Sequence, residues 1–218
     1  MMKNALITGA SSGIGRATAR ALARENYNLI ICGRRQDRLD ELASELSSLV
    51  NIYTLRFDVS DFSAVMEAIE SLPAEFKTID LLVNNAGNAH GLDPIDTGDV
   101  EDWDAMIDSN IKGLLYVSKA IIPGMVARKS GHIINIGSTA GKEVYPSGNV
   151  YCATKHAVNA LNEGMRMDLF QHGIKVGAIH PGLVETEFSQ VRFKGDEQRA
   201  GRVYNGFVPL RPEDIADI

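Results

Sequence analysis

Short apolar runs that alternate with longer segments of helical period constrain this chain more than any other feature. The runs cover residues 5–8, 28–32, 52–57, 80–84, 132–136 and 174–179. They are rich in Ile, Val and Leu at successive positions, which is typical of parallel strands covered by helices on both faces. Strand–helix alternation repeated six times predicts one parallel α/β sheet with right-handed crossovers.

The segments between the runs predict helices. Leu39, Leu42 and Leu46 fall on one helical stripe, and residues 100–127 and 150–171 predict two longer helices. The 218 residues show no repeat or linker, so a single domain over residues 1–218 is expected. The stretch from about 183 to 210 has no clear period and is too long for an ordinary connection. We expect it to be a substrate lid.

Composition excludes several classes of function. A net charge of −6, with 44% hydrophobic and 23% charged residues, argues against disorder and against nucleic-acid or membrane-surface partners. No apolar stretch reaches the roughly 18 residues that a membrane helix needs, and no signal peptide fits the N-terminus. Cys32, Cys152 and the five histidines lack metal-ligand spacing. We therefore predict buried thiols, no metal and a cytoplasmic location.

A glycine-rich turn, TGASSGIG (8–15), follows the first predicted strand and leads into a helix. The N–H groups and the dipole at a helix N-terminus favour an anion, and glycines let a pyrophosphate approach the backbone. A tight turn that needs glycine for geometry alone is the alternative. The position between the first strand and the first helix favours dinucleotide binding.

The second strand ends in CGRRQDR (32–38), with Arg34 and Arg35 where an NAD-binding fold usually places an acid. A guanidinium there suits a 2′-phosphate, which it binds through paired, charged hydrogen bonds. We therefore predict NADP as the cofactor. The alternative is an exposed basic start to the next helix.

Two further strand ends are expected at the same edge of the sheet. Asp58 would accept a hydrogen bond from the adenine amine, and Val59 would pack on the ring. In NNAG (84–87), Asn85 and Gly87 would let the cofactor pass close to the backbone. Either motif alone would be an ordinary turn, but parallel strands bring their carboxyl ends to one crevice.

Tyr151 and Lys155, in GNVYCATKHA (148–157), are spaced to lie on one face of a helix. The helix dipole, the ammonium group and an oxidised nicotinamide would each favour a phenolate. We therefore expect the pKa of Tyr151 to fall from the usual value of about 10, so that the phenol accepts a proton nearer neutrality. An exposed helical pair without chemistry is the alternative.

Two polar residues complete the predicted catalytic group. Ser138, at the end of the fifth strand, is expected to hydrogen-bond the substrate oxygen. Asn110 lies in an otherwise apolar helix, where asparagine is a poor helix former. We expect Asn110 to open the helix locally and to hold a water that connects Lys155 to solvent.

The chain resembles the short-chain dehydrogenase/reductase family over essentially its whole length. TGASSGIG, NNAG, the helical Asn110, Ser138, YCATK and the PG of HPGLVETEF stand in the family's order and spacing. The resemblance implies a Rossmann-type, doubly wound parallel sheet in three layers, with a catalytic tetrad of Asn110, Ser138, Tyr151 and Lys155. It also implies that Lys155 binds the nicotinamide ribose and that residues 181–189 border the nicotinamide.

The resulting prediction is hydride transfer between an alcohol and NADP, with the proton taken by Tyr151. The predicted cofactor-binding residues come from the glycine loop, the strand ends, the catalytic helix and the segment after the sixth strand: Gly9, Ser11, Ser12, Gly13, Ile14, Arg34, Arg35, Asp58, Val59, Asn85, Gly87, Tyr151, Lys155, Pro181, Gly182, Val184 and Thr186. The predicted substrate-binding residues are Ser138, Tyr151 and Arg192.

Segments 72–87, 130–141, 145–155 and 181–196 are similar to the group of NADP-dependent 3-hydroxy acid (serine, allo-threonine) dehydrogenases that also reduce malonic semialdehyde. A carboxylate substrate needs a cation, for which Arg192 is the first candidate and Lys194 a weaker one. Solvated loop charges are the alternative for both. For the whole protein the alternatives are a reductase of another carbonyl, such as a 3-oxoacyl thioester or a sugar, and a non-catalytic NADP-sensing module.

The family normally continues through a last strand, whereas this chain stops at RPEDIADI (211–218). The resemblance therefore implies either an incomplete C-terminal part, in which the last edge strand is missing, or an unusual natural end. The two long helices commonly pair between subunits in this family, so a homotetramer or a homodimer is expected.

Overall fold

The computed structural model describes residues 2–218, and these residues contain one six-stranded, entirely parallel sheet. The strands follow the order β3-β2-β1-β4-β5-β6, so the direction of winding reverses between β1 and β4. Their bounds are β1 (Asn4–Thr8), β2 (Asn28–Gly33), β3 (Ile52–Arg56), β4 (Leu81–Asn84), β5 (Gly131–Ile136) and β6 (Ile174–Ile179). All six predicted strands and the doubly wound fold class are confirmed.

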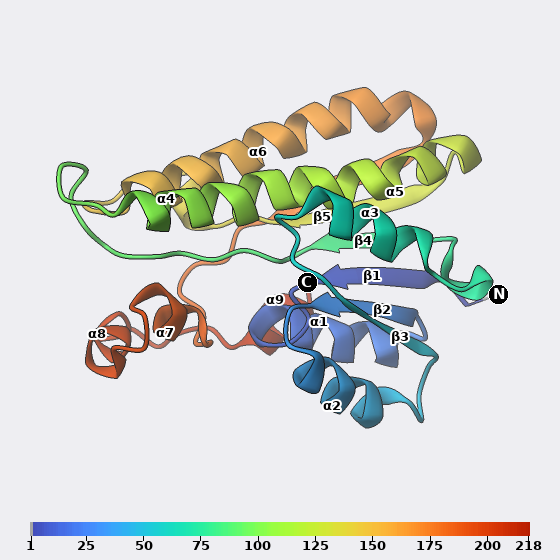
Figure 1. Ribbon diagram of the computed structural model, residues 1–218, viewed down its shortest axis with the longest axis horizontal. Coiled ribbons are helices and arrows are strands. Elements are labelled where there is room, and N and C mark those ends of the chain that lie inside the picture. The colour runs from blue at the N-terminus through green and yellow to red at the C-terminus, as the bar shows by residue number, and fades with distance from the viewer. Residues whose placement is uncertain (1) are drawn as a thin grey trace.

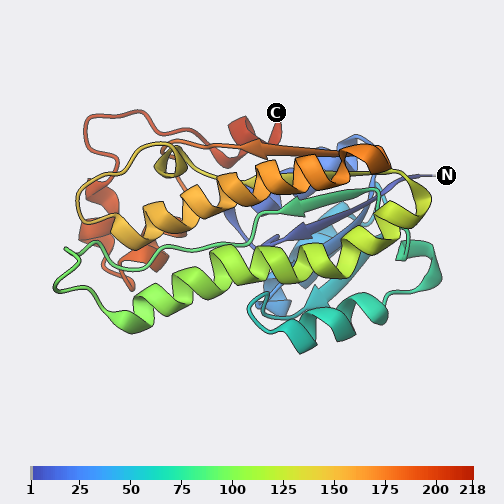
Figure 2. The same ribbon diagram turned by 90° about the horizontal axis from the view of Figure 1, so that it is seen from above.

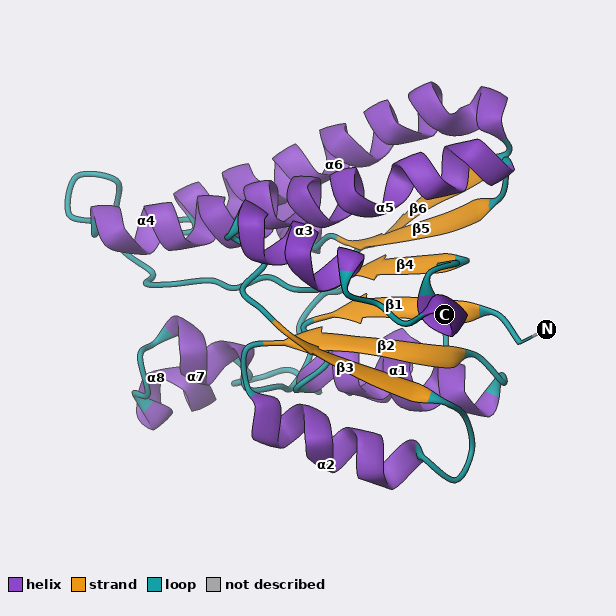
Figure 3. Ribbon diagram, turned by 45° about the vertical axis from the view of Figure 1, so that its right-hand side comes forward, coloured by secondary structure: helices purple, strands orange, loops and turns teal. Residues whose placement is uncertain are grey.

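Helices cover both faces of this sheet (Figures 1 and 3). One face carries α3 (Phe62–Glu70), α5 (Leu114–Arg128) and α6 (Asn149–Leu169), and α4 (Val100–Ile107) leads into α5. The other face carries α1 (Gly13–Arg24), α2 (Gln36–Leu46) and α9 (Pro212–Ala216), which packs on α1. The shorter elements are η1 (Ala74–Phe76), η3 (Thr139–Gly141), η4 (Phe170–His172), α7 (Phe188–Arg192) and α8 (Glu197–Arg202).

Alternate strand residues face opposite layers, which explains why the runs are apolar at every position. Leu6 and Ile30 belong to the core under α3, α5 and α6, whereas Ile7 and Ile31 belong to the core under α1 and α2. All four side chains are fully buried, and each stabilises the fold by roughly 1.5–3 kcal/mol. The predicted stripe of residues 39, 42 and 46 is also buried, on the inner face of α2.

The predicted helix over 100–127 forms as three joined parts. Between α4 and α5, the segment η2 (Asp108–Gly113) is one turn of π-helix, which is wider than an α-helical turn. Figure 2 shows α4 and α5 running beside α6 along the same face. Within the described residues, every helix is too short or too polar to span a bilayer.

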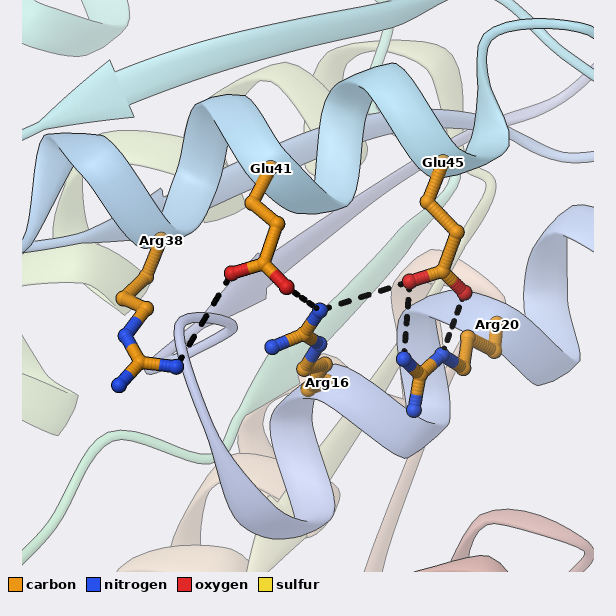
Figure 4. Close-up of polar contacts among 5 residues, drawn as sticks. All are labelled: Arg16, Arg20, Arg38, Glu41 and Glu45. Atoms are coloured by element: carbon orange, nitrogen blue, oxygen red, sulfur yellow. Dashed lines mark hydrogen bonds and ion pairs between the residues drawn. The ribbon is translucent and has the colours of Figure 1, made fainter.

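An ion network joins α1 to α2 across the outer surface (Figure 4). Arg16 contacts Glu41 at 2.9 Å, and the Nε of Arg20 contacts Glu45 at 2.7 Å. Arg38 approaches Glu41 at 3.9 Å from within α2. The network thus connects the helix that follows the glycine loop to the helix that follows Arg35.

Candidate active site

A cleft of about 710 Å³ lies across the carboxyl ends of the strands, where doubly wound folds bind their ligands. Figure 1 shows α7 and α8 beyond the arrowheads of β1 and β2, on the same side as the start of α6. Every predicted cofactor- and substrate-binding residue lines this cleft, from the glycine loop at 9–14 to Arg192. The topology therefore brings together residues that are up to 183 positions apart in the sequence, from Gly9 to Arg192.

The glycine loop is shaped by its contact with the loop after β4. Gly9 has a φ of +66°, and a Cβ there would lie only 2.8 Å from the Nδ2 of Asn85. That Nδ2 donates to the carbonyl oxygen of Thr8 at 2.8 Å, and the Thr8 hydroxyl accepts from the Asn85 backbone N–H at 3.0 Å. Asn85 thus holds the two loops together, in addition to lining the cleft. Its structural partner Thr8 was not singled out from the sequence.

The start of α1 is open to an anion. Its N-cap, Ser12, makes no side-chain capping hydrogen bond, and the first turn contains no acidic residue. The N–H groups and the positive end of the dipole therefore face the cleft without a protein anion on that turn. This is the arrangement predicted for a pyrophosphate site.

Two arginines stand at the rim of the cleft beyond β2. Arg34 is 70% exposed, and its Nη1 lies 3.4 Å from the Oδ2 of Asp58. Arg35 forms an ion pair with Glu187 at 2.9 Å and donates to the Ser11 hydroxyl at 3.3 Å. Both guanidinium groups can therefore be approached from the cleft, and both already face a carboxylate of the protein.

The loop after β3 places Asp58 and Val59 as predicted. Burial acts to raise the pKa of Asp58, but hydrogen bonds from Ser60 and the charge of Arg34 outweigh it and leave that pKa below its usual value. The carboxylate therefore remains an acceptor at neutral pH. Val59 packs closely on Gly113, where a Cβ would lie 2.6 Å from its Cγ2.

Tyr151 and Lys155 lie one turn apart near the start of α6, and both are buried. The Nζ of Lys155 is 6.0 Å from the centre of the Tyr151 ring and donates to the carbonyl oxygen of Ile136 at 3.0 Å. Ser138 is also buried, and its hydroxyl accepts from the N–H of Ala140 at 3.1 Å. Strand β5 and helix α6 thus bring three of the four predicted catalytic side chains to one wall of the cleft.

Without bound cofactor, the protein's own groups do not lower the pKa of Tyr151, whereas the expected fall depends also on the charge of an oxidised nicotinamide. Burial raises the pKa of Tyr151 to about 12, while a hydrogen bond with Ser138 and the charge of Arg192 oppose this rise only in part. Burial also lowers the pKa of Lys155 to about 8. The physical reason is that removal of water destabilises the phenolate and the ammonium alike, and this cost exceeds the benefit of their proximity.

Asn110 lies behind this wall, in the π-helical turn η2. Its Nδ2 donates to the carbonyl oxygen of Asn88 at 2.8 Å and to Thr154 Oγ1 at 3.0 Å, and its Oδ1 accepts from the Asn88 N–H at 2.8 Å. The side chain therefore connects the loop after β4 to α6 beside Lys155. The predicted local opening of the helix is confirmed by η2. The predicted water stays a prediction.

The segment from 183 to 210 folds over the cleft as a loop with paired ends. Val184 and Leu210 form a parallel bridge, and the N–H of Leu210 donates to Leu183 at 2.9 Å. Between these ends lie α7 and α8, which the sequence pattern did not predict. The side chain of Thr186 reaches the glycine loop, because a Cβ on Gly13 would lie 3.2 Å from its Cγ2.

The two lid cations have different surroundings. Arg192 is half-buried in the cleft, with its Cζ 5.6 Å from the centre of the Tyr151 ring. Lys194 points to the outer surface, where it contacts Asp102 at 3.0 Å and Asp99 at 3.6 Å. Of these two candidates for a substrate carboxylate, only Arg192 faces the cleft.

Two aromatic side chains at the reacting end were not named individually as site residues from the sequence, although Phe188 falls within the segment 181–189 that was expected to border the nicotinamide. Phe188 packs on Tyr151 with the ring centres 5.6 Å apart, and Tyr145 hydrogen-bonds Arg192 through its hydroxyl. Tyr145 lies six residues before Tyr151, and Phe188 lies four residues before Arg192. This closeness in the sequence is the signal that could have pointed to them. No group of three or more His, Cys, Asp or Glu side chains within 2–218 is arranged to hold a metal ion.

Comparison with known proteins gives one consistent result. Residues 3–197 match the model of the short chain dehydrogenase family. The chain is 49% identical over 213 residues, 97% of its length and 85% of the relative's, to the NADP-dependent 3-hydroxy acid dehydrogenase YdfG of Shigella flexneri. It is 44% identical over 219 residues, 99% of its length and 85% of the relative's, to an NADP-dependent 3-hydroxy acid dehydrogenase of Schizosaccharomyces pombe. A solved closed form of serine dehydrogenase complexed with NADP⁺ is 48% identical, with a TM-score of 0.93 over 98% of this chain and 86% of the other.

Proposed function

The chain belongs to the short-chain dehydrogenase family, and we propose that it transfers hydride between NADP and a small 3-hydroxy acid or the corresponding carbonyl compound. Substrates of the serine, allo-threonine and 3-hydroxypropionate type fit this proposal. The names of the similar dehydrogenases support it, as does the NADP in the similar serine dehydrogenase.

One observation carries the choice of an acid as substrate. The guanidinium of Arg192 lies in the cleft beside Tyr151 and forms no ion pair with any residue that the structure describes. A half-buried cation without a counter-ion is costly, so this position favours an anionic ligand. A carboxylate bound there would place a hydroxyl one or two carbons away close to Tyr151 and Ser138.

NADP fits the remaining part of the cleft. We propose that the pyrophosphate lies on the start of α1, that Arg34 and Arg35 bind the 2′-phosphate, and that Asp58 and Val59 contact the adenine. Asn85 and Gly87 would border the cofactor from the loop after β4, and residues 181–189 would border the nicotinamide. The bound nicotinamide supplies the redox chemistry, and its oxidised ring adds a positive charge.

The protein's own part is alignment and proton transfer. In oxidation, we propose that Ser138 and Tyr151 hydrogen-bond the substrate hydroxyl and that Tyr151 takes its proton. Lys155 would bind the nicotinamide ribose and stabilise the phenolate as it forms. Asn110 would hold the π-helical turn and a water beside Lys155. The loop over 183–210 would act as a lid that keeps water from the reacting atoms.

We also propose a cellular location and an oligomeric state. Two buried free thiols, Cys32 and Cys152, suit a cytoplasmic enzyme. The adjacent α5 and α6 suit contacts between subunits in a homotetramer or a homodimer.

A substrate screen tests the proposed function. We expect the absorbance of NADPH to rise with NADP⁺ and serine or 3-hydroxypropionate. NAD⁺ should support a much lower rate. Turnover of bulky ketones, 3-oxoacyl thioesters or sugars with NADPH, without turnover of any small hydroxy acid, would contradict the proposal.

A further inference from the structure

Tyr145 lies in the turn that leads into α6, and its ring is held in one place. The carbonyl oxygen of Tyr145 accepts from the N–H of Gly148 at 3.1 Å. Its ring packs directly on Gly148, so closely that a Cβ at that position would overlap the ring. The phenol is therefore fixed relative to the first turn of α6, which carries Tyr151.

Arg192 approaches this phenol from the lid and is itself anchored. Its Nε donates to the carbonyl oxygen of Gly91 at 2.9 Å, and its own carbonyl oxygen accepts from the N–H of Gly91 at 2.9 Å. Its Nη1 donates to the Tyr145 hydroxyl at 2.9 Å. The guanidinium carbon lies 5.5 Å from the Tyr145 ring centre and 5.6 Å from the Tyr151 ring centre, so it is close to both rings.

The direction of this hydrogen bond determines what remains for a ligand. A guanidinium only donates, so the Tyr145 oxygen is the acceptor in this hydrogen bond, and its own O–H is left to donate either to the nearby Cys152 sulfur or to a ligand. Burial raises the pKa of Tyr145, with the nearby Arg192 only partly opposing it, so the phenol keeps its proton at neutral pH. Nη2 of Arg192 hydrogen-bonds no residue that the structure describes. One neutral donor and one charged donor therefore face the same part of the cleft.

We propose that Tyr145 is a substrate-binding residue, whose hydroxyl donates to the carboxylate of the 3-hydroxy acid while Arg192 binds the same group. This inference rests on the proposed function and adds to it the residue that selects an acid over a neutral alcohol. Two donors held next to each other, with the guanidinium 5.6 Å from the Tyr151 ring centre, suit a carboxylate near the reacting carbon. Selectivity arises because a neutral analogue leaves the buried cation without its partner.

A purely supporting role is the competing explanation, in which Tyr145 only holds Arg192 in place. The two roles differ once Arg192 is removed. A direct donor still contributes to acid binding in an Arg192→Ala protein, whereas a support has nothing left to hold.

The experiment compares wild type, Tyr145→Phe, Arg192→Ala and the double variant with NADP⁺ and either 3-hydroxypropionate or its neutral amide. We expect Tyr145→Phe to raise KM for the acid by about tenfold or more, the usual effect of losing a hydrogen bond to a charged group. The loss in kcat/KM should be larger for the acid than for the amide, whose neutral carbonyl is a weaker acceptor of the same hydrogen bond. The double variant should show a higher KM than Arg192→Ala alone. Tyr116→Phe, outside the cleft on α5, controls for loss of a phenolic hydroxyl.

Two results would overturn the inference while leaving the proposed function intact. One is an unchanged KM for the acid in Tyr145→Phe. The other is a double variant that equals Arg192→Ala, which assigns Tyr145 a supporting role only. Failure of the wild type to oxidise any hydroxy acid would instead refute the proposed function itself, and with it the inference.

Discussion

Arg35 and Glu187 form an ion pair of 2.9 Å that joins the loop after β2 to the lid. In our account Arg35 also binds the 2′-phosphate of NADP, so the Glu187 carboxylate and that phosphate compete for one guanidinium. Glu187→Gln should therefore tighten NADP⁺ binding about two- to fivefold, since an exposed ion pair contributes up to about 1 kcal/mol. NAD⁺ binding should not change.

Titration calorimetry of both cofactors measures this effect. Glu185→Gln is the matched control, because Glu185 is exposed and forms no ion pair within the described part of the chain. Weaker NADP⁺ binding by Glu187→Gln would show instead that the pair is needed to hold the lid over the cofactor.

Arg34 can be tested by reversing its charge. Arg34→Glu should weaken NADP⁺ by at least about tenfold, because a charged hydrogen bond is lost and a repulsion is added. NAD⁺ has no 2′-phosphate and should be affected far less. Arg38→Glu, on the outer side of α2, provides the control. An equal loss of affinity for both cofactors would show that Arg34 does not bind the 2′-phosphate.

The network of Figure 4 predicts a pH-dependent contribution to stability. The hydrogen bond from Arg20 lowers the pKa of Glu45 below its unfolded value of about 4.5. A carboxyl with a lowered folded-state pKa adds stability above its unfolded pKa and loses it as the pH falls through the folded value. Arg20→Gln should therefore cost about 0.5–1 kcal/mol at pH 7, and the cost should fade below pH 4.5.

Urea unfolding at pH 7 and at the acid end of the stable range measures this difference. High salt should also reduce it, since both partners are partly exposed. Arg24→Gln in the same helix controls for the loss of one exposed charge. A cost that is independent of pH and salt would point to lost packing of the arginine stem.

The raised pKa of Tyr151 leads to a prediction about the pH profile. Oxidation needs the phenolate, so kcat/KM for the hydroxy acid should rise with pH, whereas reduction needs the phenol and should fall. Because bound NADP⁺ adds a positive charge beside the phenol, we expect the oxidation profile to level off below pH 10, roughly the pKa of an ordinary phenol. A profile that still rises beyond that pH would mean that the value of about 12 set by burial governs the reaction.

The fold and most of the site could be predicted because each depends on local pattern. Apolar runs at 5–8 and 28–32 became buried strands, and the glycines at 9 and 13 lie where the backbone takes a positive φ. Asn110 is a polar residue in an otherwise apolar helix, and this indicated the local opening that the structure shows as a π-helical turn. Each of these signals can be recognised within a short stretch of the chain, although the contacts that explain it, such as Gly9 with Asn85, are long-range.

What could not be predicted depends on contacts between distant segments. The pairing of Tyr145 with Arg192 spans 47 residues, and neither residue's surroundings in sequence reveal it. The pKa of Tyr151 was expected to fall with the help of an oxidised nicotinamide, but without cofactor it is raised, because the degree of burial is a property of the packed cleft. The sequence ranked Arg192 above Lys194, and the structure separates the two by the direction in which each side chain leaves the lid.

The most direct test of the central claim is the activity of Tyr151→Phe, which keeps the ring and removes only the hydroxyl. With NADP⁺ and 3-hydroxypropionate, we expect kcat to fall by roughly a hundredfold or more, the usual contribution of a general base, while NADP⁺ still binds. Full oxidoreductase activity in a folded, NADP⁺-binding Tyr151→Phe protein would show that another group accepts the proton.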